Sequence, residues 1–516
     1  MRWKKTPFIE ITKGIAFLVL TLCFLENAAL AEPAALNLTP EEAVKRALRN
    51  NLSIKIDRLA PEIAATAVER AESGYDPIIF GEVSTGGDAA INDMSGTGSR
   101  TLDEPLSSVD LVLRAGVKKV FDTGTTIEAA ISGGVARKNE RSGDSETLSE
   151  PHLGYGGGGA VTLRQAILRG ADREANNAEI AAASAERNAA REELRRKAEL
   201  LAAETLDAYW ELFAAQADVK TQEVGLKQAE AILKETEALI TAGKQPEVEK
   251  VAAMYVVQIQ RRAITEAKAK EKNASDKLAR LLGDLKGAAE NTRGFVLKAA
   301  PEVRKPSVDM KELEDVAFRR RGDHQARLEK VKARASLAKA ASNNLLPRLD
   351  FAASVGVGRV SDGGGRISGL GGVTPGTTPN ATNLTWSVGF ILEIPLGNRL
   401  ARSQKMKADL EHQRAKMEVD DARQVIAEEL KISWRNVETA WETLTLTRSA
   451  VRLAGLKFEN ERDRYRAGKS SAQMLTLVQA DLLKERLNLE EAKAKYNQSL
   501  VALRVASGTL VDKVKG

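Results

Sequence analysis

Two similar stretches lie 225 positions apart in the chain: "TAGKQPEVEK" at Thr241–Lys250 and "RAGKSSAQML" at Arg466–Leu475. The pentapeptide "EAKAK" recurs at the same displacement further along each stretch. Glycine adopts the left-handed conformation that ends a helix at little steric cost. We therefore predict that Gly243 and Gly468 end equivalent helices, and that the chain contains two copies of one helical hairpin.

A seven-residue hydrophobic repeat precedes each of these glycines. In the second copy it runs through Leu430, Val437, Leu444, Val451, Phe458 and Tyr465, and the positions 225 earlier are Thr205, Leu212, Val219, Leu226, Leu233 and Ile240. A period of 3.5 residues is typical of a coiled-coil seam. No proline interrupts residues 171–240 or 400–465. Each copy is therefore expected to contain a helix about 100 Å long, at about 1.5 Å per residue.

The residues around each glycine predict a tight turn followed by a second helix that runs back along the first. The turns are Ala242, Gly243, Lys244 and Ala467, Gly468, Lys469. Pro246 suits the first turn of a helix, and Ser470 or Ser471 suits the N-cap of its counterpart. Gly283 and Gly508, again 225 positions apart, are expected to end the two return helices.

The two copies also begin alike. "EEAVKRALRNN" (Glu41–Asn51) leads to "YDPIIF", and "LEDVAFRRRGD" (Leu313–Asp323) leads to "LLPRLDF". Pro77 and Pro347, displaced by 270, are predicted to mark where helix gives way to strand, because proline excludes the α conformation from its predecessor. The first copy holds 45 more residues than the second between this point and its long helix.

The segment that follows each of these prolines predicts strands. "VDLVLRAGV" (Val109–Val117), "TIEAAISGGV" (Thr126–Val135) and "LTWSVGFILEI" (Leu384–Ile394) alternate apolar and mainly polar residues. Period-two alternation over about ten residues is typical of a barrel strand with one face in lipid and one in water. A soluble β-sandwich bearing helical arms is the alternative interpretation of these strands.

The N-terminus predicts export. "MRWKK" is a basic region, "GIAFLVLTLCFL" is an apolar run too short to span a bilayer, and "ALA" at residues 29–31 is a cleavage signal. We expect cleavage after Ala31 and removal of Cys23, the only cysteine; lipidation of Cys23 is the less favoured alternative. The rest of the chain would then have no thiol for a disulfide or a metal site.

Composition argues against several function classes. The net charge of +6 over 516 residues is too small and dispersed to indicate nucleic-acid binding. Charged residues follow the helix-face pattern of a solvated coiled coil. Three scattered histidines, His152, His324 and His412, offer nothing from which to build a catalytic or metal site, so we predict no enzyme activity and no cofactor.

The expected fold is α+β, mainly α, and internally duplicated. Its predicted divisions are a signal peptide at 1–31, a first repeat at 32–290, a linker at 291–308 and a second repeat at 309–516. The first repeat comprises an N-terminal helix at 40–74, strands within about 78–166, a long helix at 171–241 and a return helix at 246–283. The second comprises an N-terminal helix at 309–345, strands within about 349–396, a long helix at 400–466 and a return helix at 471–507.

With this order of elements the chain resembles the TolC-type outer-membrane efflux protein family over Leu36–Leu510. The resemblance rests on "ALRNN" with "YDPIIF", "LRQAILRG", "LARLLGD", "IPLGN" and "YRAGKSSAQMLTLVQADLLKERLNLEEAKAKY", in that doubled arrangement. It implies a homotrimer whose strands complete one β-barrel in outer-membrane lipid and whose twelve long helical segments form a tunnel through the periplasm. It further implies a passive exit duct in a Gram-negative bacterium, docked through the tip turns to a periplasmic adaptor and an inner-membrane transporter.

Two features depart from the family pattern. Members often carry acidic residues shortly after the tip glycine; Glu249, with Glu247 nearby, fits this pattern and could line the aperture, whereas Met474 and Leu477 occupy the second copy's positions. An ordinary solvated acid in the first helical turn is the alternative. Members usually supply two strands per copy, whereas the first copy here predicts four, which either widen the barrel or leave a hairpin outside the wall.

A second function is compatible with these patterns. A soluble periplasmic structural or adaptor protein could use the coiled-coil hairpins for docking and the strands as a soluble module. Adaptors usually have one hairpin and not two in tandem, which favours the exit duct.

Overall fold

The structure, a computed structural model, describes residues 36–89, 107–138, 152–283, 295–298, 301, 303–360 and 382–511. The predicted signal peptide, with Cys23 and the cleavage site after Ala31, lies outside these residues. The mainly helical α+β class predicted from the sequence is confirmed. In the part of the chain that is described, no helix is both long and apolar enough to cross a bilayer.

The chain divides into two compact units. Unit 1 comprises residues up to Arg58, Leu194–Gly322 and Arg423–Gly516; unit 2 comprises Leu59–Glu193 and Asp323–Ala422. Two long helices, α6 (Ala178–Thr241) and α11 (Arg399–Arg466), contribute residues to both units.

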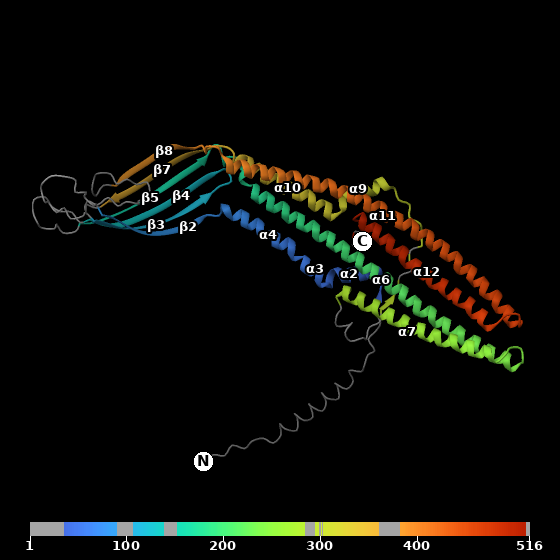
Figure 1. Ribbon diagram of the computed structural model, residues 1–516. Coiled ribbons are helices and arrows are strands. Elements are labelled where there is room, and N and C mark those ends of the chain that lie inside the picture. The colour runs from blue at the N-terminus through green and yellow to red at the C-terminus, as the bar shows by residue number, and fades with distance from the viewer. Residues whose placement is uncertain are drawn as a thin grey trace, which may run out of the picture. The chain divides into compact units, whose positions relative to one another are not determined.

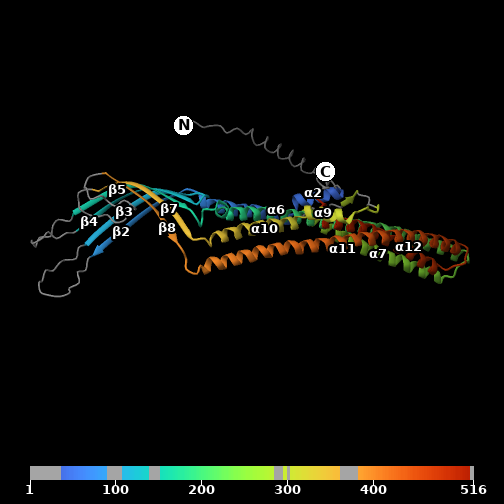
Figure 2. The ribbon, with the colours of Figure 1, turned by 90° about the horizontal axis from the view of Figure 1, so that it is seen from above.

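Unit 1 is helical apart from one short pair of strands. Besides its parts of α6 and α11, it contains β1 (Leu36–Leu38), α2 (Pro40–Asn50), α3 (Leu52–Asp57), α7 (Val248–Leu282), β6 (Phe295–Leu297), α9 (Met310–Arg320) and α12 (Ala472–Ala506). Helices α6 and α7 form one antiparallel hairpin, and α11 and α12 form the other (Figure 1). Helix α12 also lies beside α7 (Figure 2).

The seven-residue repeat is buried along most of α11 and along part of α6. On α11 only Val451 of the six positions is half-buried, whereas on α6 the last three positions, Leu226, Leu233 and Ile240, are half-buried and Ala229, Ile232 and Thr236 are buried in their place. Leu212, Leu430, Leu444 and Tyr465 are all completely buried. The one polar seam position, Thr205, is buried as well, and its hydroxyl donates to the carbonyl of Leu201 at 2.7 Å. This backbone bond removes the cost of burying the hydroxyl group.

The strands β1 and β6 pair in parallel beside α6. Leu36 pairs with Phe295, and the Tyr209 hydroxyl of α6 donates to the Leu38 carbonyl at 3.2 Å. Helix α2 starts next to this pair, with Thr39 as its N-cap and Pro40 in its first turn. The Thr39 and Glu42 side chains each bond the other's backbone N–H, forming a capping box that satisfies two amides left free at the helix start.

Each predicted N-terminal helix, at 40–74 and at 309–345, is interrupted once or more. The breaks at Asn51 and Arg321 lie 270 positions apart and have similar extended backbones, with ψ of 132° and 121°. The Asn51 amide donates to the Leu281 carbonyl at 2.9 Å, and the Arg321 guanidinium contacts the Ala506 carbonyl at 3.4 Å. Each polar side chain thus bonds a carbonyl at the end of a return helix, which the periodicity of the sequence does not reveal.

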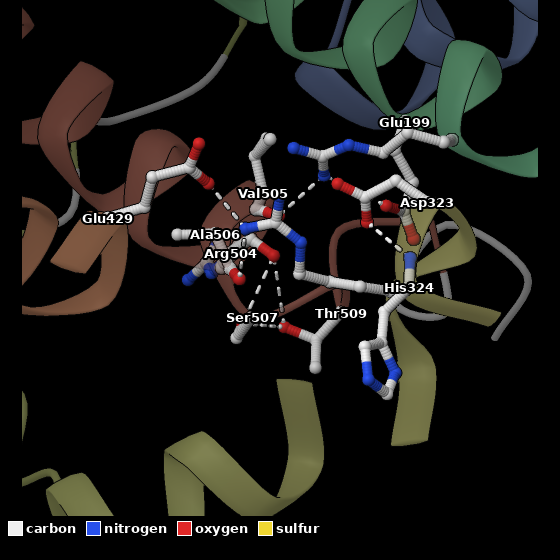
Figure 3. A network of polar contacts seen from close by, with 11 residues as sticks. Glu199, Asp323, His324, Glu429, Arg504, Val505, Ala506, Ser507 and Thr509 are labelled. Carbon is white, nitrogen blue, oxygen red and sulfur yellow. Dashed lines mark hydrogen bonds and ion pairs between the residues drawn. The ribbon is translucent and has the colours of Figure 1, made fainter. Parts of the chain in front are cut away.

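The glycine that follows each return helix packs against the same break. Gly283 and Gly508 have φ of +73° and +68°. A Cβ on Gly283 would lie 2.8 Å from the backbone of Asn50, and one on Gly508 would lie 3.0 Å from the Arg321 nitrogen. Figure 3 shows the polar contacts at the end of α12, near Gly508. There the hydroxyls of Ser507 and Thr509 lie 2.9 Å apart.

Unit 2 contains the six-stranded antiparallel sheet and the helices next to it. Its elements, besides parts of α6 and α11, are α4 (Leu59–Glu72), a 3₁₀ turn η1 (Ser73–Tyr75), β2 (Ile78–Ala89), β3 (Ser107–Val120), β4 (Thr125–Lys138), β5 (His152–Ala166), α5 (Arg173–Asn176), α10 (Gly322–Asn343), β7 (Arg348–Val360) and β8 (Asn383–Glu393). The strand order is β2-β3-β4-β5-β7-β8, which follows the chain (Figure 1). Strands β2 and β7 begin directly after Pro77 and Pro347.

In unit 2, α6 packs on α10 through small residues. Ala182 and Ala185 contact Ala333, with Leu337 beside them. Ion pairs flank this contact, including Lys330 with Glu193 at 2.6 Å. Alanine at such a contact allows two helices to approach closely.

We predict that Gly283→Ala destabilises the protein more than Gly243→Ala. Both glycines have φ near +70°, so each substitution costs about 1–2 kcal/mol of backbone strain. Only the Cβ at position 283 also meets backbone atoms, because nothing lies within 4 Å of the Cβ position at Gly243. Thermal unfolding followed by circular dichroism at 222 nm provides the comparison, and equal losses of stability would contradict the close contact with Asn50.

Candidate functional site

The sheet presents one apolar face. Register pairing places one residue from each strand in a single row, namely Ile79, Val117, Ala129, Val161, Val355 and Trp386. All six side chains are exposed, and Trp386 is 75% exposed. Neighbouring positions on this face are also apolar, among them Leu113, Ile131 and Phe390. Such a continuous exposed apolar surface indicates contact with lipid or protein.

The opposite face is polar and carries ion pairs. The row adjacent to the apolar one consists of Ile78, Lys118, Glu128, Thr162, Ser354 and Ser387. Arg114 pairs with Glu128 across β3 and β4, and the Arg164 Nε donates to Asp350 at 2.8 Å across β5 and β7. Arg348 contacts the same Asp350 carboxylate at 2.8 Å. This face is therefore suited to water.

The hairpin of β3 and β4 is a continuous part of the sheet. It lies between β2 and β5 and pairs with both along nearly its whole length. Strands β2 and β3 pair from Ile78 with Lys118 to Ala89 with Ser107, and strands β4 and β5 pair from Thr125 with Gln165 to Lys138 with His152. Of the two alternatives that the sequence left open, the structure therefore supports the hairpin as part of the sheet.

The two predicted tip turns have the same backbone geometry. Gly243 and Gly468 both have φ of +70°. In the first tip the Lys244 N–H donates to Leu239 at 2.9 Å, and in the second the Lys469 N–H donates to Arg464 at the same distance. The six turn residues, Ala242, Gly243, Lys244, Ala467, Gly468 and Lys469, are all exposed. Exposed main-chain turns of this kind are available to a partner.

Polar contacts join the two tips. The Tyr465 hydroxyl, which is fully buried, lies 2.9 Å from that of Thr236. Near the turns, the Gln245 amide donates to the Ser470 carbonyl at 3.3 Å, and these two residues are equivalent positions of the two copies. Burial raises the pKa of Tyr465, with smaller contributions from the charges of Glu249 and Glu235.

Glu247 and Glu249 differ in their surroundings. The Glu249 carboxylate accepts a hydrogen bond of 3.0 Å from the Ala472 backbone N–H, which begins α12 in the other hairpin. Glu247 is exposed at the N-terminal end of α7 and forms no side-chain cap bond. A carboxylate at a helix N-terminus is favoured by the helix dipole, so Glu249 links one hairpin to the next.

A polar cavity of about 640 Å³ lies among α6, α7, α11 and α12. Its lining includes Asp207 and Glu211 of α6, Lys277 of α7, Thr439 of α11 and Lys495 of α12. Burial raises the pKa of the Asp207 carboxyl from 3.8 to about 6; Lys277 opposes this, while the negative charges of Glu211 and Glu204 add to it.

Sequence reasoning missed this cavity. Asp207 lies two positions from Tyr209, so the two side chains point to nearly opposite sides of α6, and Tyr209 contacts β1. The one signal available was a lone acid in the otherwise apolar run "LDAYW". Within the described residues, no group of three or more His, Cys, Asp or Glu side chains is arranged to hold a metal ion.

Comparisons with known proteins agree with these features. Residues 317–509, from the end of α9 to the turn after α12, match the family described as outer membrane efflux protein. No curated protein sequence matches the chain.

Several solved structures share the fold at low sequence identity. The outer-membrane channel OprN is 17% identical, with a TM-score of 0.63, over 91% of this chain and 90% of its own. CusC, whose structures concern folding and transmembrane channel formation, is 14% identical, with a TM-score of 0.64, over 93% and 95%. The Campylobacter jejuni CmeC outer membrane channel is 16% identical, with a TM-score of 0.61, over 92% and 88%.

These matches extend across both copies of the repeat, since more than nine-tenths of the chain is covered in each. The three solved structures are described in terms of outer-membrane or transmembrane channels. Residues 317–509 therefore form an outer membrane efflux protein domain, and the chain as a whole has the duplicated fold of TolC-type outer membrane channels.

Proposed function

We propose that the protein is the exit duct of a tripartite efflux or type I secretion system in the cell outer membrane of a Gram-negative bacterium. Three copies form one channel that passes substrate passively from an inner-membrane transporter and a periplasmic adaptor to the exterior. The observation that carries this proposal is the two-faced sheet, with an exposed apolar row over all six strands and ion pairs on the opposite side.

The two faces support insertion in lipid around water. An exposed apolar surface of this extent is stable when lipid covers it, and the paired charges of Arg114, Glu128, Arg164 and Asp350 need water or one another. Strands can cross a membrane only when every backbone group is paired, which requires a closed sheet.

The hairpins support the tunnel and its docking end. The two hairpins, α6 with α7 and α11 with α12, supply the long helices that a tunnel requires. Beside the first tip, α7 exposes Val248, Val251 and Tyr255, which are spaced to lie on one face of the helix. We assign these side chains and the tip turns to adaptor docking.

The direct test combines fractionation with conductance. We expect the full chain, expressed with its native N-terminus in a Gram-negative host, to be recovered with outer membranes. The purified trimer should form ion-conducting pores in planar bilayers. Recovery of the whole population in the soluble periplasmic fraction would instead favour the soluble adaptor function.

We predict that Glu249→Ala increases the basal conductance of the channel and that Glu247→Ala does not. Loss of the charge-assisted bond to Ala472 N–H removes about 1–2 kcal/mol of contact between the hairpins, enough to shift the open population several-fold. Cation selectivity is measured in the same bilayers. If both carboxylates line the aperture, both variants should also lose cation preference, and unchanged conductance in Glu249→Ala would refute its linking role.

We predict that Asp207→Asn stabilises the protein at pH 7.5 and not at pH 4. Because the folded-state pKa of about 6 exceeds the ordinary 3.8, the ionised carboxylate disfavours the folded state above pH 6, and protonation relieves this cost as the pH falls toward 4. The difference should be on the order of 1 kcal/mol after solvent screening. Thermal unfolding across pH 4–7.5 measures it, with Asp276→Asn, on an exposed part of α7, controlling for the loss of one charge.

A further inference from the structure

We propose that each chain contributes six strands to the membrane wall, so that three chains close a barrel of eighteen strands. This inference rests on the proposed trimeric duct and deepens it, because it fixes the width of the membrane pore. In this arrangement β3 and β4 belong to the wall and do not stand apart from it.

The side chains of the β3–β4 hairpin follow the same two-faced pattern as the rest of the sheet. Residues of β3 and β4 continue the apolar row through Val117 and Ala129, and their opposite face carries the Arg114–Glu128 ion pair. A hairpin folded into a water-filled pore would place its exposed apolar face in water, and one lying outside the wall would expose its ion pair to lipid. Both faces of this hairpin match those of the neighbouring strands.

The short turn between β3 and β4 is anchored to the residues that end and follow β5. The Asn176 amide donates to the Asp122 carbonyl at 2.8 Å, and the Gln165 amide donates to the Thr123 carbonyl at 2.9 Å. Arg173 also pairs with Asp122. A Cβ on Gly124, whose φ is +76°, would overlap the Gly170 carbonyl oxygen, so the turn lies directly against the segment that joins β5 to α6.

The same segment also holds the other flank of the hairpin. The Tyr75 hydroxyl, directly before β2, donates to the Asn176 carbonyl at 2.9 Å. The turn of the hairpin is therefore bonded to the end of β5 through Gln165 and to α5 through Asn176, and Asn176 in turn is bonded to Tyr75, directly before β2. These contacts hold β3 and β4 in line with β2 and β5.

The two edge strands of the sheet can pair with further copies of the chain and so close a barrel. Among the described strands, β2 and β8 are the edges of the sheet, and their backbone groups need partners in lipid. Because the sheet is antiparallel throughout and six is even, β2 of one copy runs antiparallel to β8 of the next in a ring. A second copy of this chain is thus the partner that each edge fits.

Strand number determines the width of the barrel. With strands about 4.8 Å apart and tilted by about 40°, eighteen strands give a backbone radius of about 18 Å, against about 12 Å for twelve. The backbone area available to the pore then increases about twofold. Such a barrel accommodates bulkier solutes than one built from four strands per chain.

Distances between equivalent spin labels in the trimer test the proposal. Cys23 is the only cysteine, so a Cys23→Ala background with one added cysteine labels each chain once, on the full protein in lipid nanodiscs. Val117→Cys lies on the hairpin, and Val355→Cys lies on β7 in the same row; both side chains are exposed on the apolar face. Equivalent points on a three-fold ring are separated by √3 times its radius.

We expect both sites to give the same inter-chain distance, near 31 Å for the backbone at a radius of about 18 Å and increased equally by the outward labels. Two equal distances near 21 Å would mean a ring of about twelve strands and would overturn the proposal. A hairpin label at a different radius from the β7 label would place the hairpin off the wall, which also overturns it. Absence of inter-chain coupling at both sites would refute the trimer itself, and thus the proposed function. Ile131→Cys and Val357→Cys, also exposed and also in one row, repeat the measurement should either first variant misfold.

Discussion

The buried seam along α6 and α11 determines how the helical hairpins pack. Helices α6 and α11 have 64 and 68 residues, and in proteins most of the stability of a helix comes from the packing of its apolar face. Residues seven apart, such as Leu212 on α6 and Leu430, Val437 and Leu444 on α11, provide that face and are removed from solvent. The tip turns, the contacts between the tips and the polar cavity all depend on helices held in this register.

Duplication explains why corresponding contacts recur in unit 1. Asn51 bonds the end of α7 and Arg321 approaches the end of α12, although an amide and a guanidinium have little chemistry in common. What the two copies share is geometry: an extended break in a short helix meets the left-handed glycine that ends a return helix. The guanidinium also reaches Glu429, so the second copy adds an ion pair at this position (Figure 3).

Each strand of the sheet places apolar side chains on one face and polar side chains on the other. One face therefore suits an apolar environment and the other suits water. Trp386, Val355 and Val117 are exposed on one face. On the other face Arg114 pairs with Glu128, and Arg164 pairs with Asp350. Since the same division extends over the hairpin of β3 and β4, the additional residues of the first copy enlarge the sheet without altering its character. The helices differ little in length between the copies, with 64 residues in α6 against 68 in α11 and 35 in each of α7 and α12, so the enlargement is confined to the strands.

The sequence by itself predicted the mainly helical class, the doubled order of elements and the glycine turns at Gly243 and Gly468. These features follow from local rules: helix and strand periods, proline exclusion and the left-handed preference of glycine. Only the tertiary structure decided that β3 and β4 lie between β2 and β5, that Glu249 bonds the start of α12, and that burial raises the pKa of Asp207. Strand order, inter-helix hydrogen bonds and desolvation depend on which distant segments of the chain pack together. The sequence next to a residue does not determine those neighbours, so local rules cannot predict these features.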